Sequence, residues 1–384
     1  MIEKITADNF TPDQQQAVDM IIDWYKNSSK REFRLAGFAG TGKSSLISLL
    51  PTILKSAIGR NIAVGYAAFT GKAAKVLRDK NIPAVTIHSM IYDATVFLNQ
   101  DTGLIEHQYA LKQRLDFDLI IIDEASMVSN ELYQDLIFFG IKIIFVGDSG
   151  QLPPVESSLN LMNENFLDFT LQKIHRQATD SNIIKISVAI RNGDNITDHQ
   201  TSDTAKMRFK DFKQEDYLKF DQIITGKNTS RVSYNKTMRQ LRGLEGEEPL
   251  PKDKMIFLRN NREAGVFNGQ QFVVTGVKKI KNGFFIHYND IDDLKSGEAS
   301  GKIWGKCINS TEPVGKIKFN KGEFSKDLLQ SDFSYCITGH KSQGSQWPAV
   351  LLADDRFGYW DQDFRRKWLY TVVTRAQKKL LWLY

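Results

Sequence analysis

Gly37-Phe-Ala-Gly-Thr-Gly-Lys-Ser44 reads G-x-x-x-x-G-K-S, a loop whose glycines let backbone N–H groups surround phosphates without a clash from Cβ atoms. Residues 33–36 before the loop predict a buried strand, and residues 43–50 after it have helical spacing. The phosphates would then lie at a helix N-terminus. A glycine-rich turn with a chance Lys-Ser pair is the alternative, but the flanking strand and helix favour a nucleoside-triphosphate site.

Individual residues of this loop have distinct expected roles. Lys43 would reach the β- and γ-phosphates, and the Ser44 hydroxyl would bind Mg²⁺. The remaining residues predicted to hold the nucleotide here are Gly37, Gly40, Thr41, Gly42 and Ser45.

A helix is predicted to begin near residue 11, ahead of the loop. Thr11 is a suitable N-cap and Pro12 suits the first helical position. The amide of Gln14 offers a donor and an acceptor that could hold an adenine edge. A solvated Gln on an amphipathic helix is the alternative.

Length and composition describe an ordinary globular protein. The 384 residues suffice for two or three domains, and no apolar run is long enough to cross a membrane. The first eight residues lack a secretory pattern, so an intracellular, cytoplasmic protein is expected. Cys307 and Cys336 form no metal-binding pair and are expected to be reduced. The net charge of +6 permits a polyanionic partner, although a solvated basic surface is the commoner meaning.

Two acidic residues follow a strand predicted at 117–122. Asp123 would hold Mg²⁺, and Glu124 would polarise the attacking water as general base. The alternative is that both acids cap the next helix, but three consecutive isoleucines running into Asp-Glu downstream of a phosphate loop favour catalysis.

The next predicted strand, beginning at Lys142, ends in a polar turn. Asp148 and Gln151 can hydrogen-bond a γ-phosphate or its water. The Leu-Pro-Pro-Val run of residues 152–155 predicts a stiff extended segment that could transmit the change on phosphate loss. Arg176, at a predicted domain edge, could stabilise the transferring phosphoryl group, although an exposed Arg is usually only solvated.

Other residues leave the predicted sheet where a second ligand could lie. Phe69, Thr70 and Lys72 follow a strand, and Lys72 is equally consistent with helix-surface charge. His88 is interpreted as a satisfied loop histidine or a phosphate-backbone contact. Alternating runs around Asn-Gln-Asp-Thr-Gly, residues 99–103, predict a β-hairpin inserted at this edge.

The order of these motifs resembles that of a superfamily 1 DNA helicase of the RecD-like and Dda-like branch, whose small members come from bacteriophages. The first half of the chain carries Thr11-Pro-Asp-Gln14, the phosphate loop, Phe69-Thr-Gly-Lys-Ala-Ala74, Thr86-Ile-His88, Asp123-Glu-Ala-Ser126, Gly147-Asp-Ser-Gly-Gln-Leu-Pro-Pro154 and Arg176-Gln177. The second half carries Tyr335-Cys-Ile-Thr-Gly-His-Lys-Ser-Gln-Gly-Ser345 and Tyr370-Thr-Val-Val-Thr-Arg375. Motifs in this order over nearly the whole chain are far more specific than the loop alone.

The resemblance implies an α/β fold of two RecA-like motor domains with parallel sheets. The first is expected at 1–173 with a hairpin insertion at about 90–112, and the second at 174–245 and 331–384. Residues 246–330 are expected to form a small β-barrel inserted in the second domain, because short strands there alternate with Gly and Asn-Gly turns.

The resemblance also implies a site for ATP and Mg²⁺ that Arg375 and Gly344 of the second domain complete. Single-stranded DNA and its junctions with duplex are the implied partners, with replication or recombination proteins besides, for a chain that acts as a monomer. The DNA contacts implied are Phe69, Thr70, Lys72, His88, Phe97, Pro153, His340 and Lys341, with Phe97 at the strand-separating hairpin.

The expected function is an ATP-dependent DNA helicase that moves 5′ to 3′ on single-stranded DNA. One alternative is a translocase that displaces proteins or remodels recombination intermediates with little unwinding. Another is a nucleotide-dependent switch or kinase, which would be indifferent to DNA and would leave the second arginine-bearing domain unexplained.

Overall fold

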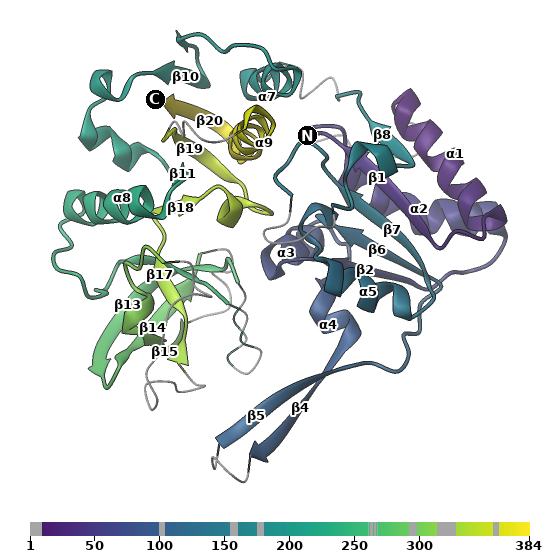
Figure 1. Ribbon diagram of the computed structural model, residues 1–384, viewed down its shortest axis with the longest axis horizontal. Coiled ribbons are helices and arrows are strands. Elements are labelled where there is room, and N and C mark those ends of the chain that lie inside the picture. The colour runs from purple at the N-terminus through teal and green to yellow at the C-terminus, as the bar shows by residue number, and fades with distance from the viewer. Residues whose placement is uncertain are drawn as a thin grey trace. The chain divides into compact units, whose positions relative to one another are not determined.

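The computed structural model describes residues 10–99, 104–153, 160–174, 180–259, 261, 264, 266, 268–291, 298–312, 328–355 and 361–384, with backbone only at 94–99 and 104–109. The chain forms two compact units, Met1–Asp180 and Ser181–Tyr384 (Figure 1). The sequence predicts domain bounds of 1–173, 174–245 with 331–384, and 246–330, and these bounds stay a prediction.

Unit 1 contains a six-stranded parallel sheet, here called sheet A. Its strand order is β3-β2-β6-β7-β1-β8, with β1 at Glu32–Gly37, β2 at Val64–Ala68, β3 at Ala84–Thr86, β6 at Leu119–Asp123, β7 at Lys142–Gly147 and β8 at Phe169–Leu171. Every pairing is parallel, so all the carboxyl ends lie along one edge. Parallel strands covered on both faces are apolar along their whole length, which accounts for the isoleucine run at 120–122.

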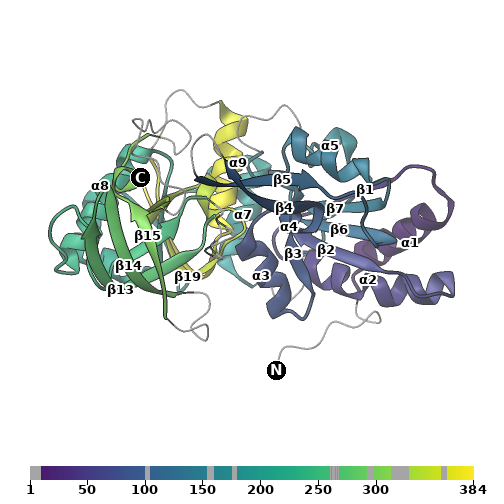
Figure 2. The same ribbon diagram turned by 90° about the horizontal axis from the view of Figure 1, so that it is seen from below.

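Helices cover both faces of sheet A. One face packs against α1 (Pro12–Asn27), α2 (Lys43–Ile58) and α3 (Gly71–Asp79), and the other against α4 (Ile87–Ile91) and α5 (Asn130–Phe138). Alternate residues of one strand serve the two layers: Ile121 faces α1–α3 and Ile122 faces α4 and α5. Figure 2 shows α2 and α5 on opposite sides of the sheet.

A two-stranded antiparallel hairpin follows α4 directly. Its strands are β4 (Tyr92–Asn99) and β5 (Leu104–Leu111), and it projects from the helical layer of unit 1 (Figure 1). The hairpin predicted from the Asn-to-Gly turn is therefore confirmed. The residues just before it form α4, which Thr86 caps by accepting a hydrogen bond from Ser89 N (3.2 Å).

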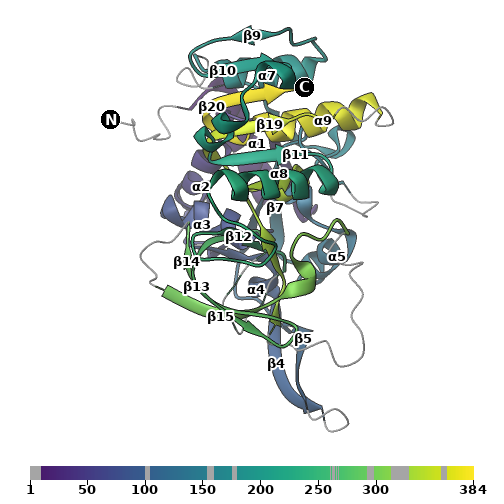
Figure 3. The ribbon, with the colours of Figure 1, turned by 90° about the vertical axis from the view of Figure 1, so that its left-hand side faces the viewer.

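Unit 2 contains a second sheet, here called sheet C, with the order β18-β11-β19-β20-β10-β9. The strands are β9 (His199–Gln200), β10 (Thr204–Met207), β11 (Gln222–Thr225), β18 (Cys336–Thr338), β19 (Trp347–Ala353) and β20 (Ala376–Leu383), and all pair in parallel except β9 with β10. Helix α8 (Asn228–Leu241) lies on one side, and α7 (Asn182–Asn192) and α9 (Gln362–Val373) on the other (Figures 1 and 3).

The segment between α8 and β18 forms a mostly antiparallel sheet, here called sheet D, with the order β16-β15-β14-β13-β12-β17. The strands are β12 (Lys254–Phe257), β13 (Gln271–Ile280), β14 (Gly283–Asp290), β15 (Glu298–Trp304), β16 (Leu328–Leu329) and β17 (Ser331–Phe333). Its two edge strands, β16 and β17, are separated in sequence by Gln330 alone. The sheet must therefore curl until its edges approach each other, which makes it nearly a closed barrel.

Short 3₁₀ turns complete the described structure: η2 (Ala125–Met127), η3 (Glu164–Phe166), η4 (Phe209–Asp211), η5 (Gln214–Lys219), η6 (Gly305–Cys307) and η8 (His340–Ser342). Within the described ranges, no helix is both long and apolar enough to span a bilayer. Cys307 and Cys336 are free, as the sequence predicted, and burial raises the pKa of both thiols. Residues 315–319, part of the segment expected to form the barrel, lie outside the described residues.

Candidate active site

Most of the described residues predicted to act in unit 1 lie where strands end at one edge of sheet A. In the parallel register Ala68 lies level with Thr86 and with Asp123, and Ala36 lies level with Gly147. The segments that follow these five strands therefore leave the sheet side by side. They carry the phosphate loop after β1, Asp123 and Glu124 at the end of β6, Asp148 and Gln151 after β7, Phe69 to Lys72 after β2, and His88 after β3.

The phosphate loop has a geometry that favours glycine at three positions. A Cβ atom on Gly37 would lie 2.8 Å from Thr41 Oγ1 and 3.0 Å from Lys43 Cγ. Gly40 and Gly42 have φ of 81° and 79°, the left-handed region that L side chains rarely adopt. Lys43 Nζ donates to the carbonyls of Gly37 and Phe38, so its side chain lies across its own loop.

Gln14 and Thr41 join helix α1 to this loop. Thr11 caps α1 with Pro12 at its first position, as predicted, and Gln14 Oε1 accepts a hydrogen bond from Thr11 N (2.9 Å). Gln14 Nε2 donates to Thr41 O (3.1 Å), and both residues are fully buried. The amide expected to hold adenine thus contacts the loop from behind, and its contact with the base stays a prediction.

The start of α2 suits an anion. The helix begins at Lys43 after Gly42, which has no side chain to cap the first turn, and Ser44 and Ser45 follow within that turn. Amide groups at a helix N-terminus carry a partial positive charge that favours phosphate. The cradle formed by Gly37, Gly40 and Gly42 therefore fits a nucleotide's phosphate chain.

Asp123 and Glu124 stand at the end of β6 beside the loop. Burial raises the pKa of the Asp123 carboxyl, and the N–H of Glu124 and the charges of Lys43 and Lys80 oppose that rise. Glu124 has φ 54° and ψ 40°, an unusual left-handed backbone for a residue other than glycine. Non-glycine residues held in this region cluster at functional sites.

Asp148 and Gln151 form a buried polar pair after β7. Asp148 is 2% exposed, and its carboxylate accepts hydrogen bonds from Gly150 N (3.0 Å) and Gln151 Nε2 (3.5 Å). The oxygen of that amide, Gln151 Oε1, is buried and has no hydrogen-bond partner among the described residues. A buried acceptor left in this state is costly unless a ligand or water satisfies it, so this oxygen fits a donor such as the water that would attack a γ-phosphate.

Protein side chains alone do not form a metal site in the described part of the chain. No group of three or more His, Cys, Asp or Glu residues there could hold an ion. Mg²⁺ commonly binds through one or two protein ligands together with phosphate oxygens and water. Ser44 and Asp123 fit such a site, since both belong to segments that leave the same edge of sheet A.

The residues after β2 and β3 that are predicted to contact DNA are half-buried. Thr70 caps α3 by accepting a hydrogen bond from Ala73 N (3.1 Å), which places Lys72 in the first turn. The ring of His88 lies between those of Phe69 (6.5 Å between centroids) and Tyr92 (5.7 Å). Pro153 is half-buried beyond Gln151.

In unit 2, His340 and Lys341 form η8, which follows β18. Burial lowers the pKa of His340, which favours its neutral form, and its ring lies 6.1 Å from that of Phe364. Lys341 Nζ donates to Asn268 Oδ1 (2.8 Å), so it joins η8 to the segment of sheet D. Burial and the charges of Arg231 and Arg259 lower the pKa of Lys341 to about 8.

Gly344 and Arg375 precede β19 and β20. Gly344 has φ 71°, again in the glycine region. Arg375 is 4% exposed, and its guanidinium donates to Thr371 O (2.8 Å), Ser345 O (3.3 Å) and Thr374 Oγ1 (3.0 Å). These bonds hold the side chain against the end of α9.

Two predicted residues cannot be placed: Arg176 and the side chain of Phe97 lie outside the described residues. The sequence interpretation missed Lys80, which follows α3 and whose charge acts on Asp123. The sequence around Lys80 carries no sign of this contact, because a lysine just past an amphipathic helix is normally solvated.

Family models match most of the chain. The model for an AAA domain matches residues 9–209, more than half of the chain, and that for a UvrD-like helicase C-terminal domain matches residues 333–384.

Curated relatives include two bacterial proteins. The ATP-dependent RecD2 DNA helicase of Deinococcus radiodurans is 25% identical over 373 residues, which cover 90% of this chain and 46% of the relative. The RecBCD enzyme subunit RecD of Buchnera aphidicola is 24% identical over 437 residues, covering 90% of this chain and 69% of the relative. The chain thus spans about half of the RecD2 helicase.

Solved structures share the fold. The crystal structure of Pif1 helicase from Bacteroides in complex with ADP-AlF3 and single-stranded DNA superposes with a TM-score of 0.54 at 19% identity, covering 97% of this chain and 92% of that one. Because the AAA-domain model matches more than half of the chain, the chain belongs to the AAA-domain family, and it is similar to the RecD and Pif1 helicases in sequence and in fold.

Proposed function

We propose that this protein is an ATP-dependent DNA helicase that translocates 5′ to 3′ on single-stranded DNA. One observation carries the proposal: a glycine phosphate cradle, the strained Glu124 and the unsatisfied Gln151 oxygen share one sheet edge with Phe69 and His88. Nucleotide chemistry and an aromatic, polar surface therefore belong to a single row of strand ends. The relatives' names support ATP and DNA as the two ligands.

On the nucleotide side, Gly37 to Ser45 would hold the phosphates, with Gln14 near the base. Ser44 and Asp123 would hold Mg²⁺, which neutralises phosphate charge when it is bound with ATP. Glu124 would accept a proton from the attacking water, and its fixed backbone would keep the carboxylate in one orientation. Asp148 and Gln151 would orient that water through the free amide oxygen.

Two arginines would complete the nucleotide site. Arg375 would leave its carbonyl partners near α9 to reach the γ-phosphate, assisted by Arg176, and Gly344 would allow close approach of the backbone. Neutral carbonyl and hydroxyl partners are weaker than a phosphate for a guanidinium, so exchange of one for the other is favourable.

On the strand side, Phe69 would stack on bases, and Thr70, Lys72, His88, Pro153, His340 and Lys341 would contact the strand. Stacking and phosphate contacts bind single strands with little dependence on sequence. The hairpin β4–β5, with Phe97 on β4, would separate the strands at a junction.

ATPase assays with and without single-stranded DNA test the proposal, together with displacement of a strand from 5′-tailed and 3′-tailed duplexes. We expect ATPase stimulated by DNA and displacement from the 5′-tailed substrate alone. ATPase indifferent to DNA would overturn the proposal and indicate the switch or kinase. DNA-stimulated ATPase without displacement would instead indicate a translocase.

A further inference from the structure

The root of the hairpin is continuous with the motor core. Helix α4 ends at Ile91 and β4 begins at Tyr92, without an intervening residue. Tyr92 pairs with Leu111 as the last rung of the hairpin, and Lys112 N extends the pairing by donating to Ile91 O (2.8 Å). Ile91 is fully buried, so one end of the hairpin is embedded in the layer that covers sheet A.

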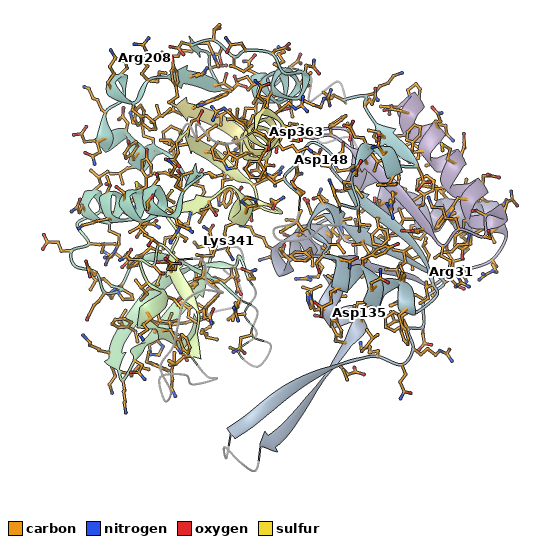
Figure 4. All side chains as sticks on the ribbon, viewed as in Figure 1. Arg31, Asp135, Asp148, Arg208, Lys341 and Asp363 are labelled. Carbon is orange, nitrogen blue, oxygen red and sulfur yellow. The ribbon has the colours of Figure 1, made fainter. Side chains whose placement is uncertain are left out.

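A side-chain hydrogen bond crosses from this root to another helix. The Tyr92 hydroxyl donates to Asp135 Oδ2 on α5. Figure 4 shows Asp135 on the side of unit 1 from which the hairpin projects. Burial, together with the Asp135 carboxylate, raises the pKa of Tyr92, so the phenol stays a donor across the neutral range.

The same tyrosine ring also lies close to the residues that are proposed to contact DNA. It lies 5.7 Å from the ring of His88, which in turn lies 6.5 Å from that of Phe69. Tyr92 thus touches both the surface proposed to stack bases and, through Asp135, the helical layer behind it. Lys112 Nζ adds a bond to Ser89 O (3.3 Å) across the root.

We propose that Tyr92 is a positioning residue for strand separation, which fixes the hairpin to α5 through Asp135 so that the hairpin moves as one body with sheet A. This inference rests on the proposed helicase function. A two-stranded hairpin is only marginally stable by itself. A loose hairpin would yield when the motor pulls the junction against it, so ATP would be hydrolysed without separation of a base pair.

The test is Tyr92→Phe, which removes the hydroxyl and keeps the ring. Tyr133→Phe is the matched control, because Tyr133 lies on α5 and donates to Glu32 Oε1 (3.1 Å), a comparable bond that does not involve the hairpin. Both variants should bind single-stranded DNA and show DNA-stimulated ATPase within about twofold of wild type. The unwinding rate should fall about tenfold for Tyr92→Phe alone, the loss that one hydrogen bond to a charged group can supply.

Asp135→Ala and the double variant Tyr92→Phe/Asp135→Ala close a cycle. If the two side chains act only through their mutual bond, the double variant should unwind no more slowly than the slower single variant. Unchanged unwinding in Tyr92→Phe would overturn the inference, as would an equal fall in Tyr133→Phe or a parallel loss of ATPase and unwinding.

Replacement of residues 94–109 by a short turn separates this inference from the proposed function. If unwinding survives that replacement, the strand-separating role of the hairpin is wrong. If the replacement abolishes unwinding while Tyr92→Phe has no effect, only the positioning role of Tyr92 is wrong.

Discussion

Helices α2 and α8 follow parallel strands in their respective units, yet different groups of the chain lie at their N-termini. Before α2 stands Gly42, in a glycine loop that brings no carboxylate of its own. Before α8, the Asp355 carboxylate accepts hydrogen bonds from Gly226 N (3.0 Å) and Lys227 N (3.0 Å). It also accepts from the hydroxyls of Thr225 (2.5 Å) and Ser230 (2.6 Å).

The difference shows how one architecture can serve binding in one unit and support in the other. An acid at a helix N-terminus is stabilised by the helix dipole and satisfies N–H groups that would otherwise need a partner. Unit 2 supplies that anion from the end of β19, whereas unit 1 leaves the position to a ligand. We therefore expect phosphate to bind at α2 and not at α8.

Glu124→Gln should give the largest effect on the unit 1 side of this comparison. Gln cannot accept the proton, so ATPase should fall on the order of 10²–10⁴-fold while nucleotide still binds. Steady-state ATPase and equilibrium binding of a fluorescent ATP analogue measure the two. Glu131→Gln, at an exposed site in the first turn of α5, is the control. Normal turnover in Glu124→Gln would remove this residue from the chemistry.

Lys43→Ala should come next. Loss of a cation from the phosphate cradle should lower ATPase on the order of 10²–10³-fold and, unlike the Glu124 variant, weaken nucleotide binding. Lys55→Ala, an exposed lysine in the last turn of the same helix, should leave both unchanged. Equal losses in the two lysine variants would mean that net charge on α2, and not the loop, explains the effect.

Asp355→Ala tests the role of the carboxylate at the N-terminus of α8 in unit 2. Removal of the carboxylate leaves two N–H groups and two hydroxyls without this acceptor, which should lower the free energy of unfolding by about 1–3 kcal/mol. Asp361→Ala, which removes a single cap from α9, should cost about 1 kcal/mol. Urea unfolding followed by circular dichroism measures both. An unchanged free energy of unfolding in Asp355→Ala would contradict the supporting role that the comparison gives to this carboxylate.

The last prediction concerns the pH dependence of stability and Lys341, which joins η8 to the segment of sheet D. Its pKa of about 8 lies below the usual value for lysine, so the folded state favours the neutral amine. This contribution to stability is lost as pH falls through about 8 and is fully present above the usual pKa of about 10.4. The free energy of unfolding of wild type relative to Lys341→Met should therefore rise between about pH 8 and pH 10. A difference that stays constant or falls would contradict this.

Local patterns predicted much of unit 1. The glycine loop, the capped start of α1 and the strands ending at Asp123 and Gly147 all depend on neighbours within a few residues, where spacing and capping rules apply. The partners of the key side chains could not be read in this way. Asp135 lies 43 residues from Tyr92, and Asp355 lies 130 residues from Thr225. Only the folded topology brings such pairs together. The residues next to Asp135 or Asp355 in the sequence do not indicate which group donates a hydrogen bond to the carboxylate.

The same limit applies to residues whose role depends on state. The phosphate contacts of Lys43 and Arg375 stay a prediction: Lys43 donates to carbonyls of its own loop, and Arg375 donates to Thr371 O and Ser345 O. A pattern of residue types identifies what a side chain can bind, but it does not specify which acceptor a long, flexible side chain takes.

The strands that open and close sheet D pair with each other: Met255 on β12 is opposite Phe333 on β17. The chain therefore enters and leaves this segment at neighbouring points. Changes of length between those points need not displace the strands of sheet C. Evolution, or a protein engineer, can therefore exchange the whole module for another with equally close ends while the parallel sheet keeps its register.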